Sequence, residues 1–206
     1  IPIHAAAPSG VDAAFWGAPG GAGAARRGVL WSYSPIEHKG GEEGAVALVA
    51  VHRELPGIPI RAFGQARRPR LPAFIEYHRR PRDETLRDLY ASSEVFLYSS
   101  RFEGCGLPPL EAQAAGCAVV STRVGDVPEF IREGENGVLV EPCDAHAMAR
   151  AVIALLREPE RRERLGRAAR AGVAAFGWER STDDLARALE CALARGRQRS
   201  SAGEAR

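Results

Sequence analysis

Short apolar runs alternate with helical stretches from residue 28 onward, and this alternation constrains the fold more than any other feature. The apolar runs lie at residues 29–33, 58–63, 74–78, 95–98, 118–121 and 137–140. Helical candidates lie among them and after them, near residues 41–54, 83–92, 109–115, 127–133 and 144–157. Parallel strands need crossover connections and bury both faces of their sheet. We therefore predict an α/β fold, with a Rossmann-like parallel sheet covered by helices on both faces.

The two ends of the chain differ in composition from its middle. Residues 1–27 are rich in alanine, glycine and proline and have no sustained period, which predicts a linker or arm. Residues 28–193 then form the predicted domain, because a chain of 206 residues fits one hydrophobic core. Residues 194–206 are polar, and we predict a disordered tail there.

Helix-capping residues set the expected boundaries in the last third of the chain. Asp144 is a good N-cap for the helix that follows it. Further helices are expected at 159–174, starting with a proline, and at 183–193, capped by Ser181 or Thr182.

Composition excludes several classes of function. Hydrophobic residues make up 45% of the chain and charged residues 26%, as in soluble globular proteins. The net charge of +2 gives no nucleic-acid footprint, and no apolar run approaches the roughly 18 residues of a membrane span. The four cysteines are scattered without metal-ligand spacing, so we expect no metal site and reduced thiols in a cytoplasmic protein.

The segment SSRFEGCGLPPLEA has the strongest potential for chemistry. Gly104 and Gly106 permit positive φ and a close approach of backbone to a ligand. Pro108 and Pro109 mark a helix start, where free N–H groups and the helix dipole favour an anion such as a diphosphate. The flanking Glu103 and Glu111 would be repelled by a phosphate, so they fit sugar hydroxyls better. Taken alone, the two glutamates would equally fit a solvated residue and a helix cap.

A second loop, YSPIEHKGG, follows the first predicted strand. It contains Lys39, the only lysine of the chain, next to two glycines that open a helix, which suits a phosphate. A plain turn with a solvated lysine is the alternative, and the local pattern does not decide between them. A third loop, at residues 118–142, is interpreted mainly as scaffold.

Taken in order, these segments resemble the C-terminal, nucleotide-sugar-binding lobe of the GT-B glycosyltransferases, in the retaining family 4. The matching text includes HKGGEEGAVAL, IRAFG, DETLRDLYASSEVFLYSSRFEGCGLPPLEAQAAGCAVVST and VGDVPEFIREGENGVLVEPCD. The similarity covers roughly residues 8–192 and is densest over 83–143. It includes the Glu-x7-Glu element of that family, formed here by Glu103 and Glu111.

The resemblance implies a role for each residue of the site. Glu103 would contact hydroxyls of the transferred sugar, Glu111 the ribose hydroxyls, and Lys39 would neutralise the departing diphosphate. The backbone of the glycine turn would hold the diphosphate and sugar; its residues are Gly104, Cys105, Gly106 and Leu107. The segment 76–78, with Tyr77 and His78, would lie near the base.

The implied reaction is retaining transfer of a hexosyl group from a nucleotide diphosphate-sugar to a glycan, lipid or small-molecule hydroxyl. The donor is a substrate, and neither a cofactor nor a metal is implied. The family's N-terminal lobe, which binds the acceptor, would be a necessary partner, so this chain alone is expected to be inactive. A peripheral position at the inner membrane is open to the full-length enzyme.

Two departures from the family pattern keep other functions open. Ser34 stands where the family usually has an arginine, unless Arg67 or Arg68 substitutes, and Cys105 replaces the usual aromatic residue. Loss of one positioned donor can cost on the order of 10²–10³ in rate. A non-catalytic nucleotide-sugar-binding module and a nucleotide-sugar 2-epimerase lobe are therefore alternatives. A dehydrogenase is disfavoured, because GCGLPP lacks the third glycine of its fingerprint.

Overall fold

The structure is a computed structural model that describes residues 10–18, 25–67 and 69–203. Six strands form one parallel sheet in the order β3-β2-β1-β4-β5-β6. Their bounds are β1 (Val29–Ser32), β2 (Ile60–Gly64), β3 (Ile75–Arg79), β4 (Val95–Tyr98), β5 (Ala118–Thr122) and β6 (Val138–Val140). The predicted parallel sheet is confirmed.

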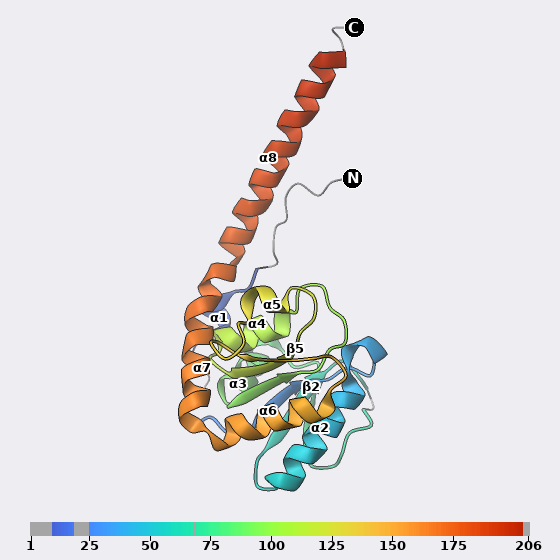
Figure 1. The fold of residues 1–206 in the computed structure, drawn as a ribbon, viewed down its shortest axis with the longest axis vertical. Helices are drawn as coiled ribbons and strands as arrows, with labels where there is room; N and C mark the ends of the chain where they lie inside the picture. Colours follow the sequence, from blue (N-terminus) through green and yellow to red (C-terminus); the bar gives the residue numbers. More distant parts are fainter. Residues whose placement is uncertain (1–9, 19–24, 68, 204–206) are drawn as a thin grey trace.

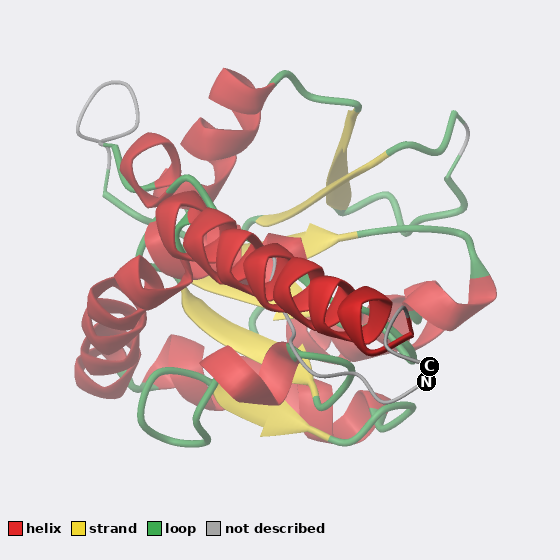
Figure 2. Cartoon of the chain, turned by 90° about the horizontal axis from the view of Figure 1, so that it is seen from above, coloured by secondary structure: helices red, strands yellow, loops and turns green. Residues whose placement is uncertain are grey.

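Helices cover both faces of this sheet (Figures 1 and 2). They are α1 (Ala13–Trp16), α2 (Gly41–Glu54), α3 (Asp83–Ala91), α4 (Leu107–Ala114), α5 (Val127–Phe130), α6 (Ala145–Arg157), α7 (Pro159–Gly172) and α8 (Trp178–Gly203). Two 3-10 helices, η2 (Glu37–Lys39) and η3 (Val173–Phe176), complete the described elements.

The order in which successive strands are added to the sheet reverses between β1 and β4. Strand β1 pairs with β2 on one side and with β4 on the other. The chain therefore builds β1, β2 and β3 outward, then returns to add β4, β5 and β6 on the opposite side. The carboxyl ends of β1 and β4 lie at this switch point, where open α/β sheets bind ligands.

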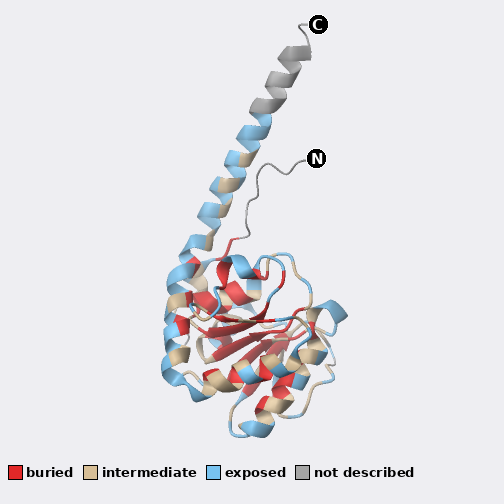
Figure 3. Ribbon diagram, in the orientation of Figure 1, coloured by how far each residue is buried: buried red, intermediate tan, exposed pale blue. Residues whose placement is uncertain are grey.

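Alternating strand residues divide the core into two clusters, one on each face of the sheet. Trp31 packs with Leu48 and Met148 under α2 and α6. Its neighbour Leu30 lies in the other cluster, with Phe96 and residues of α3 and α4. Both faces of the central strands are buried, as Figure 3 shows, because crossover helices cover each side.

Capping explains where two helices begin and end. The Asp144 carboxylate accepts a hydrogen bond from the Ala147 N–H at 2.7 Å, which confirms the predicted N-cap of α6. Helix α5 ends at Phe130, three residues earlier than predicted, because Asn136 captures its carboxyl end. The Asn136 amide donates to the Phe130 carbonyl at 2.8 Å and accepts from the Arg132 N–H at 2.7 Å.

Part of the predicted N-terminal linker is packed onto the domain. Val11 is buried, its N–H donates to the Phe176 carbonyl at 2.9 Å, and it forms a β-bridge with Gly177. Helix α1 then packs against α4. Residues 10–18 of the predicted linker or arm thus lie against the domain, while residues 1–9 and 19–24 lie outside the described part.

The last helix is longer than predicted at both ends. Helix α8 begins at Trp178, so Ser181 and Thr182 lie inside it, and the Thr182 hydroxyl donates to the Trp178 carbonyl at 2.7 Å. It continues to Gly203, where the sequence predicts a disordered tail. Beyond the globular body (Figure 1), α8 exposes Leu185, Leu189 and Leu193.

Helix α2 offers a matched test of the two-faced core. Leu48 is fully buried against the sheet, whereas Val46 on the same helix is 54% exposed. We expect Leu48→Ala to lower the free energy of unfolding by about 2–5 kcal/mol, because it leaves a cavity. Val46→Ala should change it by less than about 0.5 kcal/mol. Urea unfolding measures both, and equal losses would contradict the burial described here.

Candidate functional site

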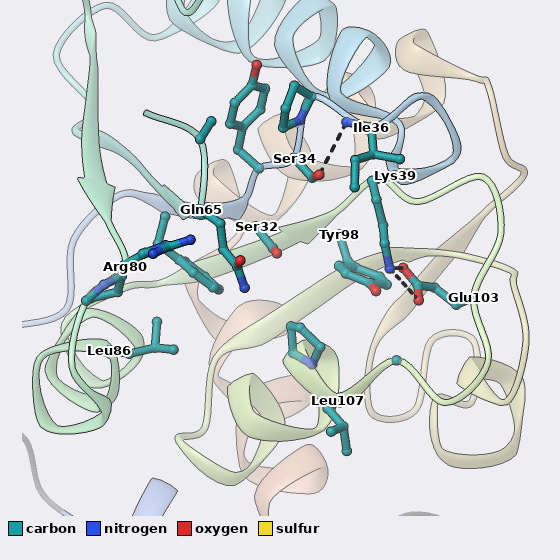
Figure 4. A pocket seen from close by; sticks show the side chains of 18 of the residues that line it. Ser32, Ser34, Ile36, Lys39, Gln65, Arg80, Leu86, Tyr98, Glu103 and Leu107 are labelled. Atoms are coloured by element: carbon teal, nitrogen blue, oxygen red, sulfur yellow. Dashed lines mark hydrogen bonds and ion pairs between the residues drawn. The ribbon is translucent and has the colours of Figure 1, made fainter. Parts of the chain in front are cut away.

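A cleft of about 1080 Å³ opens at the switch point, beyond the carboxyl ends of β1, β2 and β4. Figure 4 shows its labelled side chains. One wall comes from the loop after β1 and the other from the glycine turn after β4. Its lining residues are Ser32, Tyr33, Ser34, Pro35, Ile36, Lys39, Phe63, Gly64, Gln65, Ala66, Arg80, Pro81, Leu86, Tyr98, Glu103, Cys105, Gly106, Leu107 and Pro108.

The loops after β1 and β4 are joined to each other by main-chain contacts. The His38 carbonyl accepts hydrogen bonds from the Arg101 N–H at 2.8 Å and the Phe102 N–H at 3.1 Å, and Ser100 Oγ lies 3.0 Å from it. Gly40 has φ +63°, and a Cβ there would overlap the Ser99 carbonyl. Position 40 therefore requires glycine because the two loops pack closely there. The Gly40 N–H donates to the Glu37 carbonyl.

An arginine outside the cleft reinforces this junction. The Arg101 side chain donates from Nε to Glu43 Oε1 at 2.8 Å and forms an ion pair with Glu37 Oε1 at 3.1 Å. Glu43 lies in the first turn of α2 and Glu37 in η2. The ion pairs of Arg101 thus hold the loop after β4 against the segment that carries Lys39.

Lys39 and Glu103 meet inside the cleft. The Lys39 ammonium donates to both carboxylate oxygens of Glu103, at 2.7 and 2.9 Å (Figure 4). The Ser100 hydroxyl donates to Glu103 Oε1 at 2.8 Å. Burial opposes ionisation of Glu103, but the hydrogen bonds from Lys39, Tyr98 and Ser100 outweigh it and lower the pKa of this carboxyl. The site therefore holds an ionised carboxylate and a cation in contact.

The two glycines of the turn play different parts. Gly106 has φ +70° and precedes the first residue of α4, and a Cβ there would lie 2.8 Å from Val127 Cγ2. Gly104 does not adopt a positive φ, and a Cβ there would meet only open space. The loop at 118–142 supports the backbone of Gly104. Gly125 (φ +50°) lies against the Gly104 carbonyl, and this carbonyl also accepts a hydrogen bond from the Asp126 N–H at 2.8 Å.

Glu111 lies beside the cleft rather than in its lining. It is on α4, one turn after Pro108, and its Oε2 accepts a hydrogen bond from the Tyr90 hydroxyl at 2.9 Å. Burial raises the pKa of Glu111 to about 6. Its partner is thus a fully buried tyrosine of α3 and not the first turn of its own helix.

The structure does not place Tyr77 and His78 in the cleft lining. The Tyr77 hydroxyl donates to the Ala66 carbonyl at 3.2 Å, and His78 Nε2 lies 3.1 Å from Glu76 Oε1. Gln65 and Arg80 line the cleft on the side of β2 and β3 (Figure 4). Neither residue was predicted from the sequence. Both directly follow these strands, and ligands of parallel sheets bind at the carboxyl ends of the strands.

Positive charge in the cleft lining comes from two side chains at opposite ends. Ser34 lines the cleft where the family has an arginine, and its hydroxyl accepts from the Ile36 N–H at 3.3 Å. Arg67 is exposed and does not line the cleft, and Arg68 lies outside the described residues. Figure 4 shows Arg80 far from Lys39, so neither it nor Arg67 takes the place of the absent arginine beside Lys39.

The described residues contain no group of three or more histidine, cysteine, aspartate or glutamate side chains that could hold a metal ion. None of the helices in residues 10–18, 25–67 and 69–203 is long and apolar enough to cross a membrane.

Comparison with known proteins identifies the domain. The Glycosyl transferases group 1 family matches residues 70–172, half of the chain. D-inositol 3-phosphate glycosyltransferase of Geodermatophilus obscurus is 42% identical over 53% of this chain and 24% of its own length. The corresponding enzyme of Streptomyces griseus is 35% identical over 62% and 27%. The chain thus spans about a quarter of the length of these relatives.

Solved structures share the fold at low sequence identity. Sucrose-phosphate synthase from Thermosynechococcus elongatus matches with a TM-score of 0.71 and 22% identity, over 95% of this chain and 52% of that one. The C-terminal domain of a group 1 glycosyl transferase (LpcC) from Francisella tularensis matches with a TM-score of 0.65 and 24% identity, over 82% and 93%. The fold is that of the GT-B glycosyltransferases, and the chain belongs to the Glycosyl transferases group 1 family.

Proposed function

We propose that this domain binds a nucleotide diphosphate-sugar as the C-terminal donor lobe of a retaining family 4 glycosyltransferase, which transfers a hexosyl group to a hydroxyl acceptor. The observation that carries the proposal is the contact of Lys39 with Glu103 in a cleft at the β1–β4 switch point. A cation for a diphosphate and a carboxylate for sugar hydroxyls stand side by side there. Anabaena HepE, which has been solved with UDP-glucose, matches with a TM-score of 0.66 and 16% identity, over 82% of this chain and 49% of its own, which supports the same fold.

The cleft has room and polarity for such a donor along its length. Its volume of about 1080 Å³ is at the upper end of ligand pockets. The diphosphate would lie between Lys39 and the start of α4 at Gly106, whose N-terminal N–H groups favour an anion. The sugar would lie on Glu103, and the base at the end formed by Gln65 and Arg80.

The proposed chemistry follows from this placement. Negative charge grows on the diphosphate as the glycosidic bond breaks, and Lys39 would stabilise that charge without a bound metal. Glu103 is ionised and acceptor-only, so it would orient the sugar through its hydroxyls. Glu111 would take the ribose hydroxyls through the carboxylate oxygen that Tyr90 does not occupy.

The acceptor side of the reaction is proposed to lie on an N-terminal lobe. The chain corresponds to about half of the sucrose-phosphate synthase structure and to almost all of the isolated LpcC C-terminal domain. Ile36 and Leu107 of the cleft lining and the nearby Phe102 are exposed, and these apolar side chains would face a second lobe. A glycan, lipid or small-molecule acceptor would bind between the two.

Two alternatives remain with specific tests. Ser34 in place of a cation favours a non-catalytic nucleotide-sugar-binding module, which would stay inactive when an N-terminal lobe is supplied. A nucleotide-sugar 2-epimerase lobe would change the donor itself, and NMR of the products would show the epimer instead of a glycosylated acceptor.

The first prediction concerns Lys39. We expect Lys39→Met to weaken binding of UDP-glucose, GDP-mannose or ADP-glucose, whichever binds, by about tenfold or more, because a charge-assisted contact to the diphosphate is lost. Arg67→Met is the matched control and should leave the affinity unchanged, since Arg67 does not line the cleft. Isothermal titration calorimetry measures both. Equal losses in the two variants would contradict the assignment of Lys39.

The second prediction concerns pH. Burial raises the pKa of Glu111 to about 6, so this carboxyl takes up a proton as the pH falls through that value and loses its charge. Nucleotide-sugar affinity should therefore fall between about pH 7 and about pH 5. In Glu111→Gln this component of the pH dependence should disappear. An identical pH profile for the variant and the wild type, measured by calorimetry, would rule out the ribose role.

The third prediction concerns activity of the chain alone. We expect the purified 206-residue protein to bind its nucleotide sugar without transferring the glycosyl group, because the proposed acceptor lobe is not supplied. Radiolabelled donor incubated with a panel of glycan and lipid acceptors would measure transfer. Labelled product above the no-enzyme control would contradict the need for a second lobe.

A further inference from the structure

The contact between Lys39 and Glu103 has a consequence for ligand choice. The proposed donor would use both groups, yet in the described structure each is the other's partner, at 2.7 and 2.9 Å. Two of the three ammonium N–H groups donate to Glu103, so a ligand that takes those donors must separate the ammonium from the carboxylate. We propose that the Lys39–Glu103 ion pair selects glycosylated over bare nucleoside diphosphates. This inference rests on the proposed function.

Fixed loops make this competition obligatory. Lys39 follows His38, whose carbonyl accepts hydrogen bonds from the N–H groups of residues 101 and 102, and it precedes Gly40, which lies against Ser99. Arg101 adds its ion pairs to Glu37 and Glu43. The two loops therefore hold the backbone of Lys39 close to that of Glu103. Only rotation of the side chains can separate the ammonium from the carboxylate.

Burial makes the separation costly for the carboxylate. The Glu103 side chain is 10% exposed, whereas that of Lys39 is 34% exposed. A buried charge that loses its partner is strongly unfavourable, because water cannot replace the lost contact. The Ser100 and Tyr98 hydroxyls still donate to Glu103, but both are neutral and neither replaces the positive charge of Lys39.

The two ligands differ in whether they offer hydrogen-bond donors to Glu103 in place of Lys39. A bare nucleoside diphosphate would take Lys39 and add further negative charge beside an unpaired carboxylate. A sugar on the diphosphate would offer hydroxyl donors to the same oxygens as the ammonium leaves. Loss of the sugar would then restore the ion pair and favour release of the nucleotide.

The experiment compares wild type with Glu103→Gln in calorimetric titrations of UDP and UDP-glucose, GDP and GDP-mannose, and ADP and ADP-glucose. Removing the competing carboxylate frees Lys39, so affinity for the bare diphosphate should rise. If the Lys39–Glu103 ion pair is intact in about nine-tenths of the free molecules, it weakens the apparent affinity about tenfold. Glu103→Gln should then strengthen binding of the bare diphosphate by about tenfold. Affinity for the glycosylated ligand should not rise, because its hydroxyls exchange a charged carboxylate for the weaker, neutral amide oxygen of glutamine.

Two controls separate this effect from a general change of charge. Glu42 is exposed in the first turn of α2, and Glu42→Gln removes the same charge without entering the cleft, so it should leave both affinities unchanged. In a Lys39→Met background, Glu103→Gln should give a smaller gain for the bare diphosphate, because it only relieves the repulsion by the carboxylate and no lysine is left to free.

The outcomes distinguish this inference from the function on which it rests. An unchanged or weaker affinity of Glu103→Gln for the bare diphosphate would overturn the inference alone, and so would an equal gain in the Lys39→Met background. Failure of the wild type to bind any of the six compounds would overturn the proposed function, and the inference with it.

Discussion

The main-chain junction between the loops after β1 and β4 is the constraint on which the site depends. One carbonyl, that of His38, accepts hydrogen bonds from the N–H groups of Arg101 and Phe102, and Gly40 allows the loops to touch because it has no Cβ. The parallel sheet brings these loops together, since β1 and β4 are neighbours at the point where strand order reverses. Without this junction, Lys39 and Glu103 would lie on separate mobile loops.

Electrostatics then gives the cleft its character. Two glutamates beside a phosphate-type helix start look contradictory in the sequence, but the structure gives each a different partner. Glu103 contacts the only lysine of the chain, which keeps it ionised despite burial. Glu111 contacts a buried tyrosine, and burial raises its pKa to about 6. The two acids are therefore unequal in charge below neutral pH, which separates their proposed roles.

Much of the fold follows from local patterns. The strand at 95–98 was predicted with its true bounds because a fully apolar run there is flanked by polar residues, and the Asp144 cap is a local interaction. The docking of residues 10–18 could not be predicted, since it depends on contacts with Phe176 and Gly177 far along the chain. The last helix was predicted too short, because Ser181 and Thr182 are typical N-cap residues. In the structure α8 extends through both residues and continues along the helix-favouring residues that follow.

The site shows the same division between local and tertiary information. Lys39, Glu103 and the turn at Gly106 could be singled out from spacing and turn chemistry. The support from Gly125 could not, because a glycine after a strand does not say which backbone it approaches. Arg80 was missed because its position in the cleft depends on a positive φ of 45° just after β3. Tyr77 and His78 were assigned to the cleft by resemblance, and their side chains turn to other partners.

A crystal structure of this chain with a bound nucleotide sugar tests the central claim most directly. The account predicts the diphosphate within hydrogen-bonding distance of Lys39 Nζ, sugar hydroxyls on Glu103, and no remaining contact between those two side chains. A ligand bound elsewhere, or a bound diphosphate with Lys39 still on Glu103, would contradict it.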